Sequence, residues 1–173
     1  MTADKKKTIL VVDDEADIRA FLKAALVEAG FNVVTACDGF EALEKIKEKK
    51  PDLISLDLVM PKRSGAKLYH DLTKNEEWSD IPVIIVTGHA RDDLGKADLK
   101  ELTMSGPGVY LEKPVKPLNY VAAIRKILDM DMPAEEKTLA EQVEMQSDLK
   151  NMIDDADPET LRRIKEMLAK KKS

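Results

Sequence analysis

The chain has 173 residues, of which 43% are hydrophobic, and this favours one domain with an appendage over two full domains. Its formal net charge of -5 argues against nucleic-acid binding driven by bulk electrostatics. The single cysteine, Cys37, cannot form an internal disulfide, which fits a reducing compartment. We expect it to pack as a small apolar residue on a strand, with a reactive thiol as the alternative. No apolar run approaches the roughly 20 residues of a membrane span, and the start does not resemble a secretory signal, so we predict a cytoplasmic protein.

Residues 8–129 alternate between two hydrophobic patterns. Short apolar or β-branched runs predict five strands, at residues 8–12, 31–36, 53–58, 81–87 and 109–111. Apolar residues at helical spacing predict five helices, at residues 18–29, 39–50, 64–72, 92–104 and 117–129. The apolar face of the first helix includes Phe21, and that of the last includes Leu118. Strands that alternate with helices through short connections predict an α/β fold, a doubly wound five-stranded parallel sheet with helices on both faces.

The run between Pro51 and Pro61 holds the most informative residue of the chain. Its near-continuous apolar character and proline flanks are typical of a buried parallel strand, and Asp57 stands at its end. A carboxylate there is costly unless a positive charge lies beside it, and ligands of open α/β sheets bind at the carboxyl ends of strands. We therefore predict that Asp57 is the chemical centre. A loop aspartate that caps the next turn is the alternative.

Polar residues at the ends of four predicted strands form one candidate site: Asp13 and Asp14, Asp57, Thr87, and Lys113. If these strands are neighbours in one sheet, the groups meet at one edge. Three carboxylates repel one another unless a cation neutralises them, and oxygen ligands of this type favour a hard ion such as Mg²⁺. Lys113 adds a mobile positive charge and Thr87 a hydroxyl donor. The set predicts a site that binds a phosphoryl group or accepts one covalently on a carboxylate.

Four motifs at these positions resemble those of the response-regulator receiver domain of bacterial two-component signalling. They are Val11-Val12-Asp13-Asp14-Glu15, Asp57-Leu58-Val59-Met60-Pro61 with Gly65, Val86-Thr87-Gly88, and Tyr110-Leu111-Glu112-Lys113-Pro114. The resemblance covers residues 6–130 and implies the flavodoxin-like fold of a receiver. It also implies that Asp57 takes a phosphoryl group from a phosphohistidine on a histidine kinase or phosphotransfer protein.

The resemblance implies a set of metal ligands. Asp14 and Asp57 would hold Mg²⁺ together with the backbone carbonyl of Val59, and Asp13 would act through water. Mg²⁺ is thus the expected cofactor.

The resemblance also assigns roles around the phosphoryl group. Thr87 and Lys113 would hold its oxygens, and Thr87 and Tyr110 fall on switch positions whose rearrangement changes protein contacts. His89 falls where a side chain can influence the lifetime of the phosphoryl group, with an exposed loop histidine as the alternative. Such a domain assists its own phosphorylation and dephosphorylation but acts on no separate substrate, so we do not expect an enzyme.

Residues 131–173 lie beyond this resemblance and predict a C-terminal helical extension. We expect two helices, at about residues 135–154 and 158–171. The first has one broad apolar face, formed by Leu139, Val143, Met145, Leu149, Met152 and Ile153. Two helices of this size cannot form an independent core, so they must pack on the receiver, on a second copy as a homo-oligomer, or on another protein. All three alternatives stay open.

The charge of the extension is divided along its length. Residues 131–159 carry ten acids and two bases, whereas residues 160–173 carry six bases and one acid. The extension is too short, and its pattern is wrong, for an output domain with a helix-turn-helix core. We expect the basic segment to be a solvated helix end and predict no DNA binding.

Two functions are compatible with these features. The first is a phosphoacceptor that switches protein contacts, or passes the phosphoryl group on in a relay, with an unknown downstream protein as target. The alternative is a phosphorylation-independent interaction or assembly module built from a receiver fold and a helical tail. Hydrolases with a strand-end aspartate nucleophile are disfavoured, because Val59 stands where those families have a second aspartate.

Overall fold

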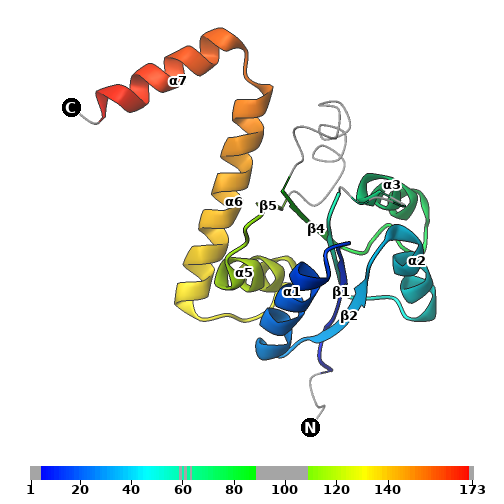
Figure 1. The fold of residues 1–173 in the computed structure, drawn as a ribbon. Coiled ribbons are helices and arrows are strands. Elements are labelled where there is room, and N and C mark those ends of the chain that lie inside the picture. Colours follow the sequence, from blue (N-terminus) through cyan, green and yellow to red (C-terminus); the bar gives the residue numbers. More distant parts are fainter. Residues whose placement is uncertain (1–4, 59, 61, 63, 89–108, 172–173) are drawn as a thin grey trace.

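The computed structural model describes residues 5–58, 60, 62, 64–88 and 109–171 (Figure 1). Five parallel strands form one sheet in the order β2-β1-β3-β4-β5. The strands are β1 (Thr8–Val12), β2 (Asn32–Ala36), β3 (Leu53–Leu56), β4 (Val83–Thr87) and β5 (Tyr110–Glu112). The predicted five-stranded parallel sheet is therefore confirmed, while the helix predicted at residues 92–104 lies outside the described residues.

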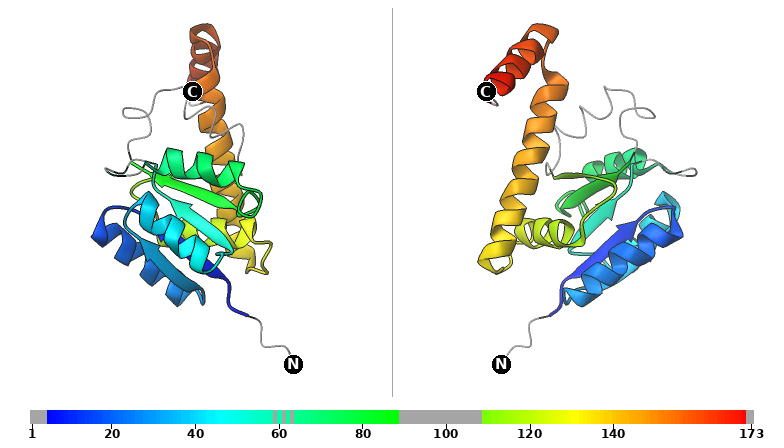
Figure 2. Two further views of the ribbon diagram at one scale, coloured as in Figure 1. Left: turned by 90° about the vertical axis from the view of Figure 1, so that its right-hand side faces the viewer. Right: turned by 60° about the vertical axis from the view of Figure 1, so that its left-hand side comes forward.

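Helices cover both faces of the sheet, as predicted (Figures 1 and 2). The described helices are α1 (Ala16–Glu28), α2 (Gly39–Glu48), α3 (Gly65–Lys74), α5 (Pro117–Ile127), α6 (Ala134–Asp155) and α7 (Pro158–Lys170). Because successive side chains of a strand point to opposite faces, Ile9 and Val11 of β1 pack in the core under α1 and α5, whereas Leu10 and Val12 pack in the core under α2 and α3. None of the described helices is long and apolar enough to cross a bilayer.

Three burial predictions are wrong. Cys37 is exposed rather than packed on a strand, because β2 ends at Ala36 and the chain bends there to enter α2. Phe21 is exposed because α1 turns Leu22 and Leu26 toward the sheet instead. Leu118 is 67% exposed because the buried part of α5 begins only at Tyr120.

Local signals place the two helices that flank the end of β3. Asp38 caps the N-terminus of α2, because its side chain accepts hydrogen bonds from the backbone N–H groups of Glu41 and Phe40. These bonds hold the pKa of Asp38 below its usual value. Ser64 caps the N-terminus of α3 in the same way, because its hydroxyl accepts from the backbone N–H of Lys67.

Of the three alternatives for the extension, packing on the receiver holds for α6. Arg125 of α5 donates twice to Glu136 of α6, at 2.7 and 2.5 Å, and also to the carbonyl of Ala29 at 3.0 Å. Lys126 pairs with Glu144. Both helices begin and end within one residue of the bounds predicted for them.

The broad apolar face predicted for the first helix of the extension is split in the structure. Ala140, Val143 and Ser147 are buried against the receiver, at positions three and four residues apart. Met145, Leu149 and Met152 are exposed. The prediction is confirmed for Val143 and wrong for the three exposed residues, because Ala140 and Ser147, which a count of large apolar residues passes over, complete the face that packs.

Candidate functional site

The carboxyl ends of β1 and β3 bring two carboxylates together. The two strands are neighbours, with Val12 opposite Leu56, so Asp13 and Asp57 follow directly on paired residues. The backbone N–H of Asp57 donates to the carbonyl of Val12 at 2.9 Å and continues the ladder by one residue. Asp13 is 1% exposed and Asp57 is 5% exposed. The sheet therefore holds two largely buried acids side by side at one edge.

Lys113 supplies the positive charge for these acids. It follows β5, and its Nζ lies 2.7 Å from Oδ2 of Asp13, 3.3 Å from Oδ2 of Asp57 and 3.4 Å from Oε1 of Glu15. Burial alone lowers the pKa of Lys113, but close contact with Asp13 and the charge of Asp57 outweigh it and raise the pKa above its usual value. Lys113 is therefore a firmly charged ammonium group at neutral pH.

Hydrogen bonds from Glu15 and Arg19 fix the orientation of Asp13. Its Oδ1 accepts from the backbone N–H of Glu15 at 2.9 Å, and its carbonyl accepts from Arg19 at 2.7 Å. The second oxygen, Oδ2, is thereby left to face Lys113. The first turn after β1 thus presents one carboxylate oxygen of Asp13 to the site.

Three carboxylates of this site could hold a metal ion. One oxygen each from Asp13, Asp14 and Asp57 lies within 4.8 Å of the others. Lys113 can neutralise only one of the carboxylate charges, so the site retains a negative excess that a divalent cation would offset. All the ligand atoms are oxygens, which suits a hard cation of the Mg²⁺ or Ca²⁺ type.

The start of α3 packs directly against the backbone of Asp57. Gly65 donates its N–H to the carbonyl of Leu58 at 3.0 Å. A Cβ atom at this position would lie 1.9 Å from the carbonyl oxygen of Asp57, which is far inside contact distance. In the sequence, Gly65 was part of a motif but had no assigned role. The structure shows that α3 can pack against the backbone of Asp57 because Gly65 has no side chain.

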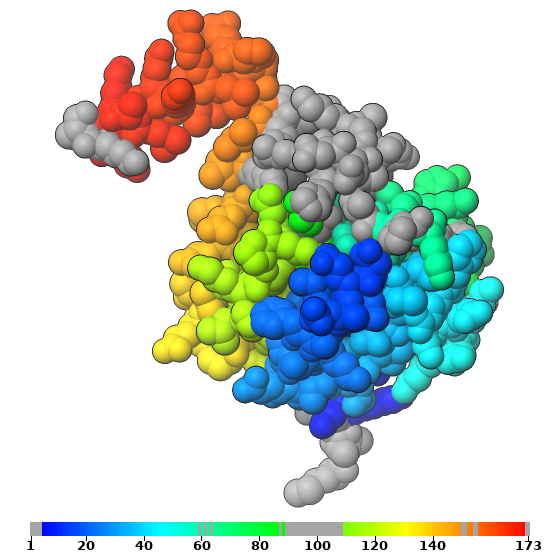
Figure 3. Space-filling model, in the orientation of Figure 1, coloured from blue at the N-terminus to red at the C-terminus, as the bar shows by residue number. Residues whose placement is uncertain are grey.

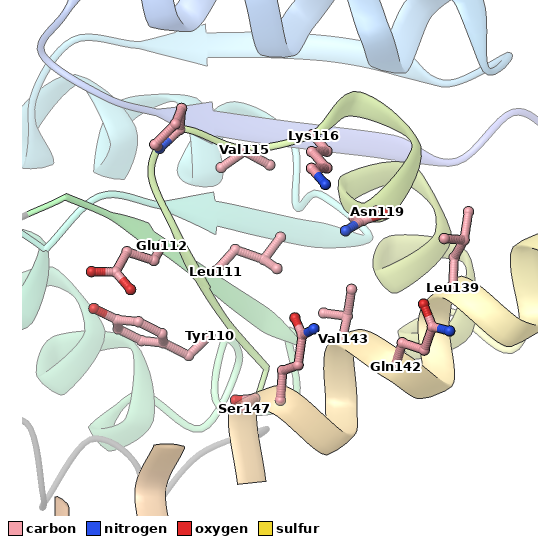
Figure 4. A pocket seen from close by; sticks show the side chains of 12 residues that line it. Tyr110, Leu111, Glu112, Val115, Lys116, Asn119, Leu139, Gln142, Val143 and Ser147 are labelled. Atoms are coloured by element: carbon pink, nitrogen blue, oxygen red, sulfur yellow. The ribbon is translucent and has the colours of Figure 1, made fainter. Parts of the chain in front are cut away.

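The remaining predicted site residues are placed as follows. Thr87 is the last residue of β4 and pairs with Glu112, and only its backbone is described. Val59 and His89 lie outside the described residues. Tyr110 begins β5, is half-buried, and lines a cavity of about 380 Å³ between β5, the start of α5, and α6 (Figure 4). The structure thus brings together Asp13, Asp14, Asp57 and Lys113, and places Tyr110 at the opposite end of β5 from Lys113.

Replacing Lys113 by methionine should lower the stability of the metal-free protein by about 3 kcal/mol, because buried carboxylates lose their partner. Mg²⁺ should then restore more stability to the variant than it adds to the wild type, because the competing ammonium group is gone. Urea unfolding at pH 7, with a chelator and with Mg²⁺, measures both effects. Lys116→Met, at an exposed lysine, is the control. A loss no larger than that of the control would contradict the assigned charge balance.

Comparison with known protein families shows that residues 9–125 match the response regulator receiver domain. Over 124 residues the chain is 40% identical to the "Probable transcriptional regulator ycf27" of Porphyridium aerugineum, covering 72% of this chain and 49% of that protein. Over 129 residues it is 37% identical to the phosphate regulon transcriptional regulatory protein PhoB of Pseudomonas aeruginosa, covering 75% and 55%. The chain therefore spans about half the length of these curated relatives.

Solved structures show the same fold. The chemotaxis protein CheY4 of Vibrio cholerae aligns with a TM-score of 0.63 at 26% identity, over 71% of this chain and 99% of that one. A CheY-like response regulator receiver domain protein of Methanospirillum hungatei aligns with a TM-score of 0.65 at 27% identity, over 78% and 98%. In the family match, α6 and α7 lie beyond the matched residues.

Proposed function

The chain belongs to the response regulator receiver domain family, and from this premise we propose that Asp57 accepts a phosphoryl group in a His-Asp phosphorelay. The observation that carries the proposal is the buried carboxylate of Asp57 at the end of β3, with an ammonium group and two further carboxylates around it. A structural aspartate would need only one partner. Here one cation is shared among several acids, which suits a site that receives further positive charge and a phosphoryl group.

The residues of this site account for the transfer step. A carboxylate oxygen of Asp57 attacks the phosphorus of a phosphohistidine, a new O–P bond forms, and the P–N bond breaks with its electron pair going to the imidazole nitrogen. Lys113, 3.3 Å from Oδ2 of Asp57, lies where it can pair with the oxygens of the arriving group. The phosphoryl donor would be a histidine kinase or a phosphotransfer protein, which offers the phosphohistidine.

A metal ion has a defined place in this proposal. Asp13, Asp14 and Asp57 would hold Mg²⁺, with the carbonyl of Val59 as a further expected ligand. When bound, Mg²⁺ would supply charge neutralisation for carboxylates and phosphoryl oxygens that otherwise repel one another.

Strand β5 links the proposed phosphorylation site to the cavity against α6, where a partner protein could bind. Lys113 follows its carboxyl end, and Tyr110 at its other end lines the cavity against α6 together with Val143 and Ser147 (Figure 4). Phosphorylation adds roughly -1.5 to -2 of charge beside Lys113 at pH 7. We expect Lys113 and Thr87 to respond to it, and the packing of Tyr110 against α6 to change as one of two states is favoured. The downstream protein would recognise that change.

Incubation with a small phosphodonor and Mg²⁺ tests the proposal by intact-mass spectrometry. We expect one phosphoryl group to be added per chain, and none when a chelator removes the metal. Retention of native circular dichroism in the chelated sample controls for unfolding. A folded protein that binds Mg²⁺ and gains no phosphoryl group, from this donor or from phosphorylated histidine kinases, would favour the phosphorylation-independent assembly module.

A further inference from the structure

The helical extension carries two exposed apolar stripes. On α6, Met145, Leu149 and Met152 are 69%, 53% and 69% exposed and lie on the face turned away from the receiver. On α7, the stripe consists of Leu161 and Leu168, which are 37% and 62% exposed, with the half-buried Ile164 between them. None of the residues of α7 is buried. Figure 3 shows α7 standing clear of the body of the molecule. Apolar surface gathered in this way is typical of an interaction site.

The link between α6 and α7 directs the second helix away from the stripe of the first. Ala156 and Asp157 are both extended, with ψ values of 138° and 160°. Pro158 restricts Asp157 to this conformation, and the Asp157 side chain fixes it there by accepting from the N–H groups of Glu159 and Thr160. As a result α7 leads away from α6 instead of folding back along it (Figures 1 and 2).

The two helices have complementary charge and matching stripes. Helix α6 contains seven acids and two bases, and α7 contains four bases and two acids. The two stripes have the same length, because one runs from residue 145 to 152 and the other from residue 161 to 168. At a rise of 1.5 Å per residue, each is about 10 Å long. The acidic and the basic halves lie on the same chain, yet that chain does not bring them together.

We propose that a second copy of this chain covers both stripes, with α7 of each copy packed on α6 of the other. In a two-fold symmetric dimer this contact forms twice. Each copy would then bury both of its stripes, and each acidic α6 would pack against a basic α7. The face of α6 that carries Ala140, Val143 and Ser147 stays on its own receiver. The association therefore needs no phosphorylation and goes beyond the proposed function.

Sedimentation equilibrium of the full, unphosphorylated chain tests this proposal. We expect a monomer–dimer equilibrium, whose dissociation constant rises more than about tenfold when Leu161 and Leu168 are both replaced by glutamate. Leu118→Glu is the matched control, since Leu118 is an exposed leucine on α5 outside the stripes and should leave the equilibrium unchanged. A wild type that is monomeric at all concentrations would overturn the proposal and leave another protein as the occupant.

Cysteine pairing separates a second copy from folding back within one chain. In a Cys37→Ser background, a chain with Leu149→Cys is mixed with a chain with Ile164→Cys, which places one thiol at the centre of each stripe. Oxidation should give the mixed disulfide dimer, and Glu166→Cys, on the opposite face of α7, should not replace Ile164→Cys in forming it. If a chain carrying both substitutions forms only an intramolecular disulfide, α7 folds back on its own α6 and the proposal is wrong.

Discussion

Replacing Asp57 by asparagine is expected to abolish phosphoryl incorporation. The amide has nearly the shape of the carboxylate but lacks its anionic oxygen, so no nucleophile faces the donor. The backbone bond from Asp57 to Val12 does not involve the side chain and should survive. The loss of one negative charge still leaves Lys113 paired with Asp13. We therefore expect a folded protein that gains no mass from a phosphodonor in the presence of Mg²⁺.

Asp38→Asn is the matched control for this result. Asp38 is another buried aspartate, but it caps the N-terminus of α2 and interacts with backbone N–H groups. Asparagine caps helices about as well as aspartate, so this variant should fold and incorporate the phosphoryl group normally. Incorporation by Asp57→Asn at the level of the wild type would assign the acceptor role to a different group.

Replacing Gly65 by alanine should cost about 3 kcal/mol of unfolding free energy, at the upper end for an overpacked site. The new Cβ would lie 1.9 Å from the carbonyl oxygen of Asp57, and 2.8 Å from both the carbonyl carbon of Asp57 and Cα of Leu58. All three atoms are backbone, so either α3 or the end of β3 must shift. Alanine is the better helix former by about 1 kcal/mol, so a net loss would have to come from this clash.

Gly88→Ala is the control for the Gly65 prediction. A Cβ at Gly88 would meet side-chain atoms of Lys113 at 3.7 and 3.8 Å, which is ordinary contact. We expect its free energy of unfolding to stay within about 0.5 kcal/mol of the wild type. Urea denaturation measures both variants, and equal stability of the two would contradict the close approach of α3 to Asp57.

The sequence allowed the sheet and much of the candidate site to be predicted for a physical reason. A buried parallel strand appears in the sequence as a run of apolar residues. An acid directly after such a run, such as Asp13 or Asp57, is therefore easy to recognise. Parallel strands end at the same edge, which brings their terminal residues together without knowledge of any side-chain contact. The contact of Lys113 with both acids is consistent with that reasoning.

Other features depend on neighbours that a local pattern does not encode. The docking of α6 rests on the pairing of Arg125 with Glu136 and on a face that includes the polar Ser147. A count of apolar residues therefore found Val143 but not the rest of this face. The close approach at Gly65 involves the absence of a side chain, which has no hydrophobic pattern. The predicted burial of Cys37 is wrong because the turn into α2, and not side-chain polarity, sets the end of β2 at Ala36.

Borohydride trapping tests the central claim most directly. An acyl phosphate on aspartate is reduced by borohydride to the corresponding alcohol, homoserine, whereas a phosphate ester on serine or threonine is not. After incubation with a phosphodonor and Mg²⁺, reduction and peptide mapping should place homoserine at position 57, in the wild type and not in the sample treated with chelator. Phosphorylated protein that yields no reduced residue there, or yields it at another acid, would contradict the account.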